Sequence, residues 1–77
     1  MFESFQGIKI YVYDFDHNPP HFHAISAEYE VLIDIRDLSV LRGEMPSNKL
    51  KQIIKWAKLN QQYLLEEFET LNPKLRK

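Results

Sequence analysis

The sequence predicts a single α+β domain in which one long C-terminal helix packs on an antiparallel sheet of three to four strands (β-β-β-β-α). Three observations indicate this class. The 77 residues leave room for one core only. Short segments with alternating apolar and polar residues precede Gly43, and apolar residues at three- and four-residue spacing follow Pro46. We therefore expect one domain over residues 1–77.

The strands are predicted from a period of two residues. In the first, Ile8, Ile10 and Val12 fall on one face, and β-branched and aromatic residues are typical of strands. The turn at residues 36–39 lacks the glycine common in such turns. The predicted strands span about residues 8–15, 21–25, 28–35 and 40–42.

Residues 47–71 are predicted to form the helix because their apolar side chains fall on one stripe. Ser47 is the expected N-cap, and Asn72-Pro73 ends the helix before a loose tail at residues 73–77. A straight helix of this length would extend about 37 Å, whereas a compact domain of this size is roughly 30 Å across. We therefore expect a kink near residues 60–62 or an end that packs on something else.

Composition excludes several classes of protein. Hydrophobic residues make up 44% and charged residues 27%, which excludes a disordered chain, a collagen-like fibre and an acidic tail. No apolar run reaches the roughly 18 residues of a membrane span, and the N-terminus lacks the features of a signal peptide. The chain has no cysteine, so no disulfide or thiolate metal site forms. We expect a cytoplasmic protein without a membrane partner.

Charge is divided unevenly along the chain. The formal net charge is −1, but residues 1–45 carry an acidic excess and residues 46–77 a basic one. This balance does not resemble that of a general nucleic-acid binder, so nucleic acid is only a weak alternative as a partner. The uneven distribution still allows one basic face.

The charges of the predicted helix oppose its macrodipole. The basic side chains come early, with Lys51, Lys55 and Lys58 predicted opposite the apolar stripe, and the acidic ones come late, from Glu66 to Glu69. Two such helices placed antiparallel would match basic half to acidic half. The sequence leaves open a solvated helix face, a homodimer through this helix, and contact with phosphate or an acidic partner.

The most distinctive feature of the sequence is a histidine cluster. His17, His21 and His23 all lie within the run Asp16-His17-Asn18-Pro19-Pro20-His21-Phe22-His23. On a strand, His21 and His23 point to the same face because they are two residues apart. The two prolines restrict the backbone between the histidines. We therefore expect a stiff loop that gathers imidazoles at one rim of the molecule.

Four roles for this cluster remain open. His17, His21 and His23 with Asp16 are candidate ligands for a divalent transition metal, although no cofactor is firmly predicted. The same histidines are candidate catalytic acids and bases that cleave RNA, with Lys9 or Arg36 binding phosphate. The third role is recognition of a partner, and the fourth is structural, with histidines bonded to the main chain and Phe22 anchored in the core. The candidate recognition residues are Tyr11, Tyr13, Asp16, His17, His21, Phe22 and His23.

The chain resembles the small bacterial proteins grouped as domain of unknown function 4160. The resemblance is carried by Tyr11-Val12-Tyr13, the run from Asp16 to His23, Ile33-Asp34-Ile35, Gly43-Glu44-Met45-Pro46 and Trp56. It implies a partner from another small family, domain of unknown function 2442, in an arrangement similar to a toxin–antitoxin pair. It implies no catalytic residue. The turn at residues 36–39 departs from the family pattern because the family usually has a glycine there.

Together, the motifs favour a non-enzymatic protein-interaction module of a bacterial two-gene, toxin–antitoxin-like system, with the Asp16–His23 loop as its recognition surface. The alternative is a small histidine-dependent ribonuclease, with or without a metal, or another metal-binding protein.

Overall fold

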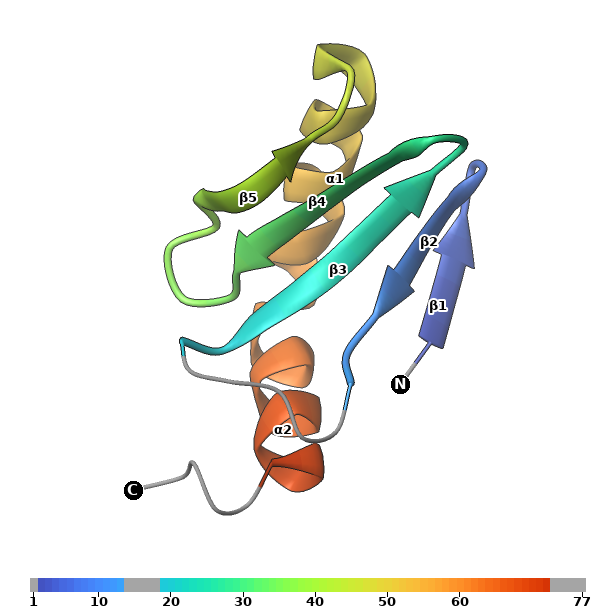
Figure 1. Cartoon of the computed structure of the whole chain (residues 1–77). Coiled ribbons are helices and arrows are strands. Elements are labelled where there is room, and N and C mark those ends of the chain that lie inside the picture. The colour runs from blue at the N-terminus through green and yellow to red at the C-terminus, as the bar shows by residue number, and fades with distance from the viewer. Residues whose placement is uncertain (1, 14–18, 73–77) are drawn as a thin grey trace.

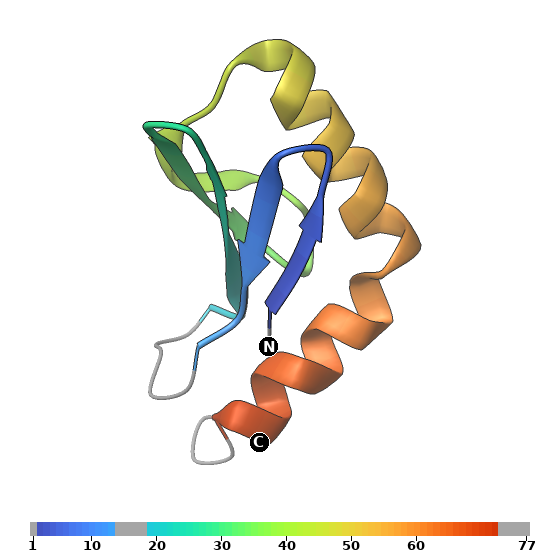
Figure 2. The ribbon, with the colours of Figure 1, turned by 90° about the vertical axis from the view of Figure 1, so that its right-hand side faces the viewer.

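The computed structural model describes residues 2–13 and 19–72 of the chain. Within these residues, an antiparallel sheet carries two helices on one of its faces (Figures 1 and 2). The strands pair in chain order, from β1 at one edge to β5 at the other, which confirms the α+β class and the antiparallel sheet. The elements are β1 (Phe2–Phe5), β2 (Ile8–Tyr11), β3 (His21–Ser26), β4 (Tyr29–Asp34), β5 (Val40–Glu44), α1 (Ser47–Leu59) and α2 (Gln61–Leu71).

The described sheet has five strands, so the prediction of three to four was wrong. The strand missed was β1, which has only four residues and pairs with β2 through a tight turn. Both turn residues, Gln6 and Gly7, adopt positive φ angles of 49° and 77°. A segment of four residues is too short to show a clear alternation of apolar and polar residues. Pairing with β2 is what makes this segment a strand.

Two predicted strand boundaries also need correction. The strand predicted over residues 8–15 ends at Tyr11, and residues 14 and 15 lie outside the described part of the chain. The strand predicted over residues 40–42 continues to Glu44 as β5. Gly43 lies within β5, opposite Val31, rather than at its end.

The core lies between the sheet and the helices. Period-two alternation places Ile8, Ile10 and Val12 on the covered face, as predicted, and all three are buried. Each helix contributes two buried side chains four residues apart, and all four belong to the stripe predicted for residues 47–71. The buried core residues are Ile8, Ile10, Val12, Phe22, Ala24, Val31, Ile33, Ile35, Met45, Ile53, Ala57, Leu64 and Phe68.

The single long helix predicted over residues 47–71 is instead two helices, and the break lies at the predicted kink. Asn60 leaves helical geometry with φ −123° and ψ 19°, and its Nδ2 donates to the Trp56 carbonyl at 2.8 Å. The Gln61 side chain then donates to the carbonyl oxygens of Ile35 and Arg36, both at 2.7 Å. These bonds tie the bend to the end of β4. The bend keeps both helices against the sheet in a molecule that measures 35 × 22 × 20 Å.

The predicted cap by Ser47 was also wrong. Ser47 is already helical, and the N-cap position is held by Pro46, whose carbonyl accepts from the Leu50 N–H at 2.9 Å. Proline has no side-chain acceptor for a capping bond, and α1 has no side-chain cap. No helix in residues 2–13 and 19–72 is long and apolar enough to cross a membrane.

The hairpin between β3 and β4 holds a strained residue. Ala27 is exposed in the two-residue loop and has φ 54°, a region that costs a non-glycine residue about 1–2 kcal/mol. We expect Ala27→Gly to stabilise the fold by roughly 0.5–1 kcal/mol in urea denaturation, because part of the relief is offset by the greater freedom of glycine when unfolded. Glu28→Gly is the control, since Glu28 is outside the positive-φ region and should gain nothing.

Candidate functional site

The face of the sheet opposite the helices carries two of the three histidines. Figure 2 shows both helices on one side of the sheet, so the other face is not covered by a helix. On that uncovered face, cross-strand pairing joins Tyr11 of β2 to His23 of β3, and His23 to Leu32 of β4. His21 pairs with Asp34 further along the same two strands. The alternation of β2 and β3 thus brings tyrosines and histidines together.

Four of these side chains form a continuous set of ring contacts, here called the aromatic–histidine cluster (Tyr11, Tyr13, His21 and His23). The Tyr11 and Tyr13 rings stack with centroids 5.5 Å apart, and Tyr13 meets His23 edge-on at 4.6 Å. His23 meets His21 edge-on at 5.2 Å. These distances are within the range of favourable ring pairs. Tyr13, which is 41% exposed, is the most accessible member.

His21 anchors the cluster to the interior. It is only 6% exposed, and its ring lies 5.7 Å from that of Phe68 in α2. Its Nδ1 is 2.8 Å from the Pro19 carbonyl oxygen, and because a carbonyl only accepts, Nδ1 carries the proton of that bond. The Pro20 carbonyl accepts in turn from the Ile35 N–H at 2.9 Å. The diproline end of the loop is thus fixed to both β3 and β4.

His23 and Tyr13 are positioned by partners from other elements. His23 Nδ1 lies 3.2 Å from Glu30 Oε2, which is diagonally across the β3–β4 hairpin. Asn72, at the end of α2, donates through Nδ2 to the Tyr13 carbonyl at 3.0 Å and also to the Phe68 carbonyl at 3.0 Å. The helix end therefore holds the backbone that follows β2, and with it the exposed tyrosine.

A buried carboxylate lies opposite His21 across the β3–β4 pair. Asp34 is buried and accepts from the Arg36 N–H at 2.7 Å, and its other oxygen is 3.6 Å from the Arg36 guanidinium. Arg36, considered above as a phosphate-binding cation, is thus paired with Asp34. The following turn is closed by two hydrogen bonds from Ser39 to the Asp37 carboxylate, through the Ser39 hydroxyl and N–H, and these hold the pKa of Asp37 below its usual value.

The structure brings together only part of the predicted set of site residues. Tyr11, Tyr13, His21 and His23 meet in one cluster, whereas Phe22 projects to the covered face and is 0% exposed. Expecting Phe22 in an exposed surface was therefore wrong, because its immediate neighbours on β3, His21 and His23, point to the opposite face of the sheet. The remaining candidates, Asp16 and His17, lie outside the described residues.

Sequence reasoning missed three contributors to the site. Glu30 could have been found from the hairpin register, since a two-residue loop at residues 27 and 28 places it diagonal to His23. Phe68 and Asn72 gave no such signal, because their position depends on the bend at Asn60. Within residues 2–13 and 19–72, no group of three histidine, cysteine or acidic side chains is arranged to hold a metal.

The fold and cluster define a small α+β protein, with a five-stranded antiparallel meander covered on one face by a bent pair of helices in the described residues. The family model described as Domain of unknown function (DUF4160) matches residues 7–69, and the chain belongs to this family. The resemblance inferred from the motifs is thereby confirmed. The searches of curated proteins and of solved structures gave no match.

Proposed function

We propose that this protein is a non-enzymatic interaction module that recognises a protein partner through the aromatic–histidine cluster. The observation that carries the proposal is the chain of ring contacts from His21 to Tyr13, which ends in a tyrosine that is 41% exposed. Tyrosine supplies a large contact area and a hydroxyl at low cost in side-chain entropy, and it is enriched among residues that dominate binding energy.

Preorganisation of the cluster supports this role. Pro19 and Pro20 accept hydrogen bonds from His21 and Ile35, and Asn72 holds the backbone of Tyr13. A surface that is fixed before binding loses less conformational entropy when the partner arrives. Asp16 and His17 adjoin this segment in sequence, and we propose that they contribute to the same recognition surface.

The partner we propose is a small protein encoded beside this one in a toxin–antitoxin-like pair that acts in the cytoplasm. This part of the proposal rests on the implication of the family resemblance, a partner from domain of unknown function 2442. The burial of His21 favours recognition over ribonuclease chemistry, because a catalytic imidazole must reach the phosphate that it serves.

Two tyrosines of nearly equal exposure test the recognition surface. Tyr13 in the cluster is 41% exposed, and Tyr63 on α2 is 42% exposed. We expect Tyr13→Ala to weaken binding of the protein encoded by the adjoining gene about 10- to 30-fold in titration calorimetry, because an aromatic anchor is lost. Tyr63→Ala should change the affinity less than about twofold.

Equal effects of the two alanine variants, or none at Tyr13, would contradict the recognition surface. The ribonuclease alternative is tested on the same preparations with a mixed-sequence RNA. Cleavage by the native chain that is lost in His23→Ala and retained in Tyr63→Ala would instead establish an enzyme and overturn the proposal.

A further inference from the structure

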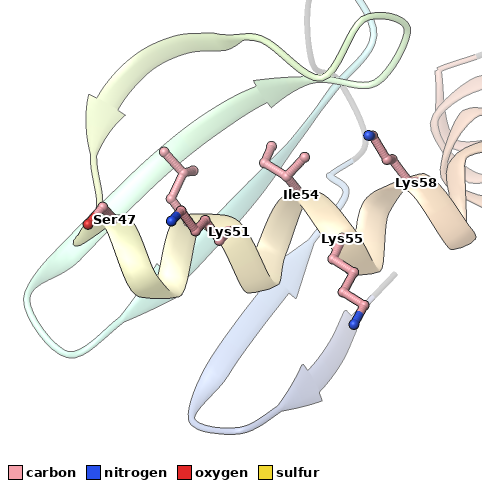
Figure 3. Close-up of a pocket in the computed structure, with 6 residues that line it drawn as sticks. Ser47, Lys51, Ile54, Lys55 and Lys58 are labelled. Atoms are coloured by element: carbon pink, nitrogen blue, oxygen red, sulfur yellow. The ribbon is translucent and has the colours of Figure 1, made fainter.

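The helices carry a second, chemically different surface, which begins on α1. Leu50 and Ile54 are half-buried and line a groove of about 460 Å³ in α1. The lysines expected on the opposite side of the helix line this same groove, and Figure 3 shows Lys55 pointing to one side of α1 with Ile54 and Lys58 on the other. The full lining is Ser47, Leu50, Lys51, Ile54, Lys55 and Lys58. The groove therefore has an apolar floor and a cationic rim.

A second depression continues this surface across the bend. It lies between the bend and the segment that follows β4, and Lys58 lines both hollows. The full lining is Ile35, Arg36, Lys58, Leu59, Gln61, Gln62 and Leu65. Leu59 is 80% exposed, the largest exposure among the large apolar residues that the structure describes as exposed. Leu59 adds exposed apolar area beside the hollow that it lines.

The charge along this surface changes sign at the bend. Lys51, Lys55 and Lys58 are exposed on α1. On α2, Gln62, Glu66 and Glu69 share one face, because residues three and four apart lie together on a helix. Lys58 and Gln62 line the same hollow across the bend. Gln62 donates to the Glu66 carboxylate at 3.1 Å, which keeps these two side chains together. One face is thus basic on α1 and acidic on α2.

We propose that this helix face binds the same face of a second copy of the chain, in antiparallel orientation about a two-fold axis near the bend. The inference is independent of the recognition function, because none of the residues on this helix face belongs to the aromatic–histidine cluster. A two-fold axis presents the same patch from both copies, so each basic α1 lies against an acidic α2.

The sequence spacing supports one register. Lys58 and Glu66 are equidistant from Gln62 in the sequence, and so are Lys55 and Glu69. Leu59 and Leu65 share the same midpoint. In an antiparallel pair centred at Gln62, Lys55 and Lys58 lie opposite Glu69 and Glu66 of the other copy. The exposed Leu59 then meets Leu65 of the other copy.

Association would also favour the charge distribution within each helix. Glu69 lies in the last turn of α2, where the macrodipole disfavours a negative charge. In the register centred at Gln62, a second copy places Lys55 opposite Glu69. A domain of this size also has little core from which to draw stability, and pairing is a common remedy.

A charge-swap experiment tests the dimer. One chain carries Lys55→Glu and Lys58→Glu, and the other carries Glu66→Lys and Glu69→Lys. We expect the native chain to dimerise in sedimentation equilibrium at low salt, and each variant alone to associate at least about 10-fold more weakly because like charges then face each other. An equimolar mixture of the two variants should recover the dimer, since every facing pair is again of opposite sign.

The control is Lys9→Glu, which makes the same change of charge on the uncovered face of the sheet and should leave association unchanged. Circular dichroism of all variants separates loss of association from loss of fold. A native chain that stays monomeric up to about 1 mM would overturn the proposal. A mixture of the two variants that fails to dimerise would also overturn the proposal. The occupant of the groove would then be an acidic segment of another protein.

Discussion

Replacing Phe22 by alanine should lower the free energy of unfolding by about 3–5 kcal/mol, the usual cost of removing a buried aromatic ring. Phe22 is 0% exposed, and its ring meets Trp56 of α1 edge-on with centroids 6.3 Å apart. Trp56 in turn stacks on Phe5 of β1 at 5.4 Å. The cavity left by Phe22→Ala would therefore lie between the sheet and α1, where rigid neighbours limit its collapse.

Comparing Phe22→Ala with Tyr13→Ala distinguishes the contribution of the covered face of the sheet to stability from that of the uncovered face to binding. Phe22→Ala should move the urea midpoint far more than Tyr13→Ala, although both remove an aromatic side chain from the same region. Tyr13→Ala should instead reduce partner binding while keeping the unfolding free energy within about 1 kcal/mol of the native value. If the two substitutions destabilise the fold equally, Phe22 does not hold the core as its burial indicates.

Much of this arrangement could be predicted from the sequence, because it follows from local periodicity. The alternation of Ile8, Ile10 and Val12 assigned the covered face of β2. The same rule placed His21 and His23 on one face, which their ring contact confirms. The length of the helical segment predicted either a kink near residues 60–62 or an end that packs on something else, and the structure has the kink.

The parts that could not be predicted depend on tertiary contacts. Whether His21 is exposed or buried is decided by Phe68, which reaches it only because α2 turns toward the start of β3. The lysines of α1 were expected opposite Leu50 and Ile54, yet they line the same groove. Helical periodicity predicts only the direction of each Cα–Cβ bond. The long aliphatic part of a lysine side chain can bend back along the neighbouring apolar surface, so lysines on another side of the helix can still line the groove.

The turn at residues 36–39 shows how a missing sequence signal can mislead. No glycine lies in this turn, and Leu38 adopts φ 61° instead. The turn still closes, since the Asp34 N–H donates to the Ser39 carbonyl at 2.9 Å and the Leu38 N–H donates to the Asp34 carbonyl at 2.8 Å. Leu38 also packs against the core, and that contact offsets part of the backbone strain.

Gly43→Ala should destabilise the fold by about 2–5 kcal/mol, through two effects that a second glycine can separate. Gly43 has φ +84°, where an alanine costs about 1–2 kcal/mol. A Cβ at this position would also come within 2.2 Å of the Glu30 carbonyl oxygen on β4. Because that atom is backbone, β5 must move away from β4 and weaken their hydrogen bonds.

Gly7→Ala is the matched control for this contact. Gly7 has a similar φ of +77°, but a Cβ there would have nothing within 4 Å, so only the backbone cost of about 1–2 kcal/mol should appear. Thermal or urea unfolding of both variants gives the difference, which measures how tightly β5 is held to β4. Hydrogen exchange should show the Gly43 variant losing protection in β5 first, as expected for an edge strand already interrupted by a bulge between Arg42 and Val40. Equal destabilisation by the two substitutions would mean that β5 can shift away from β4 without loss of stability. A glycine would then be needed at residue 43 only because of its positive φ.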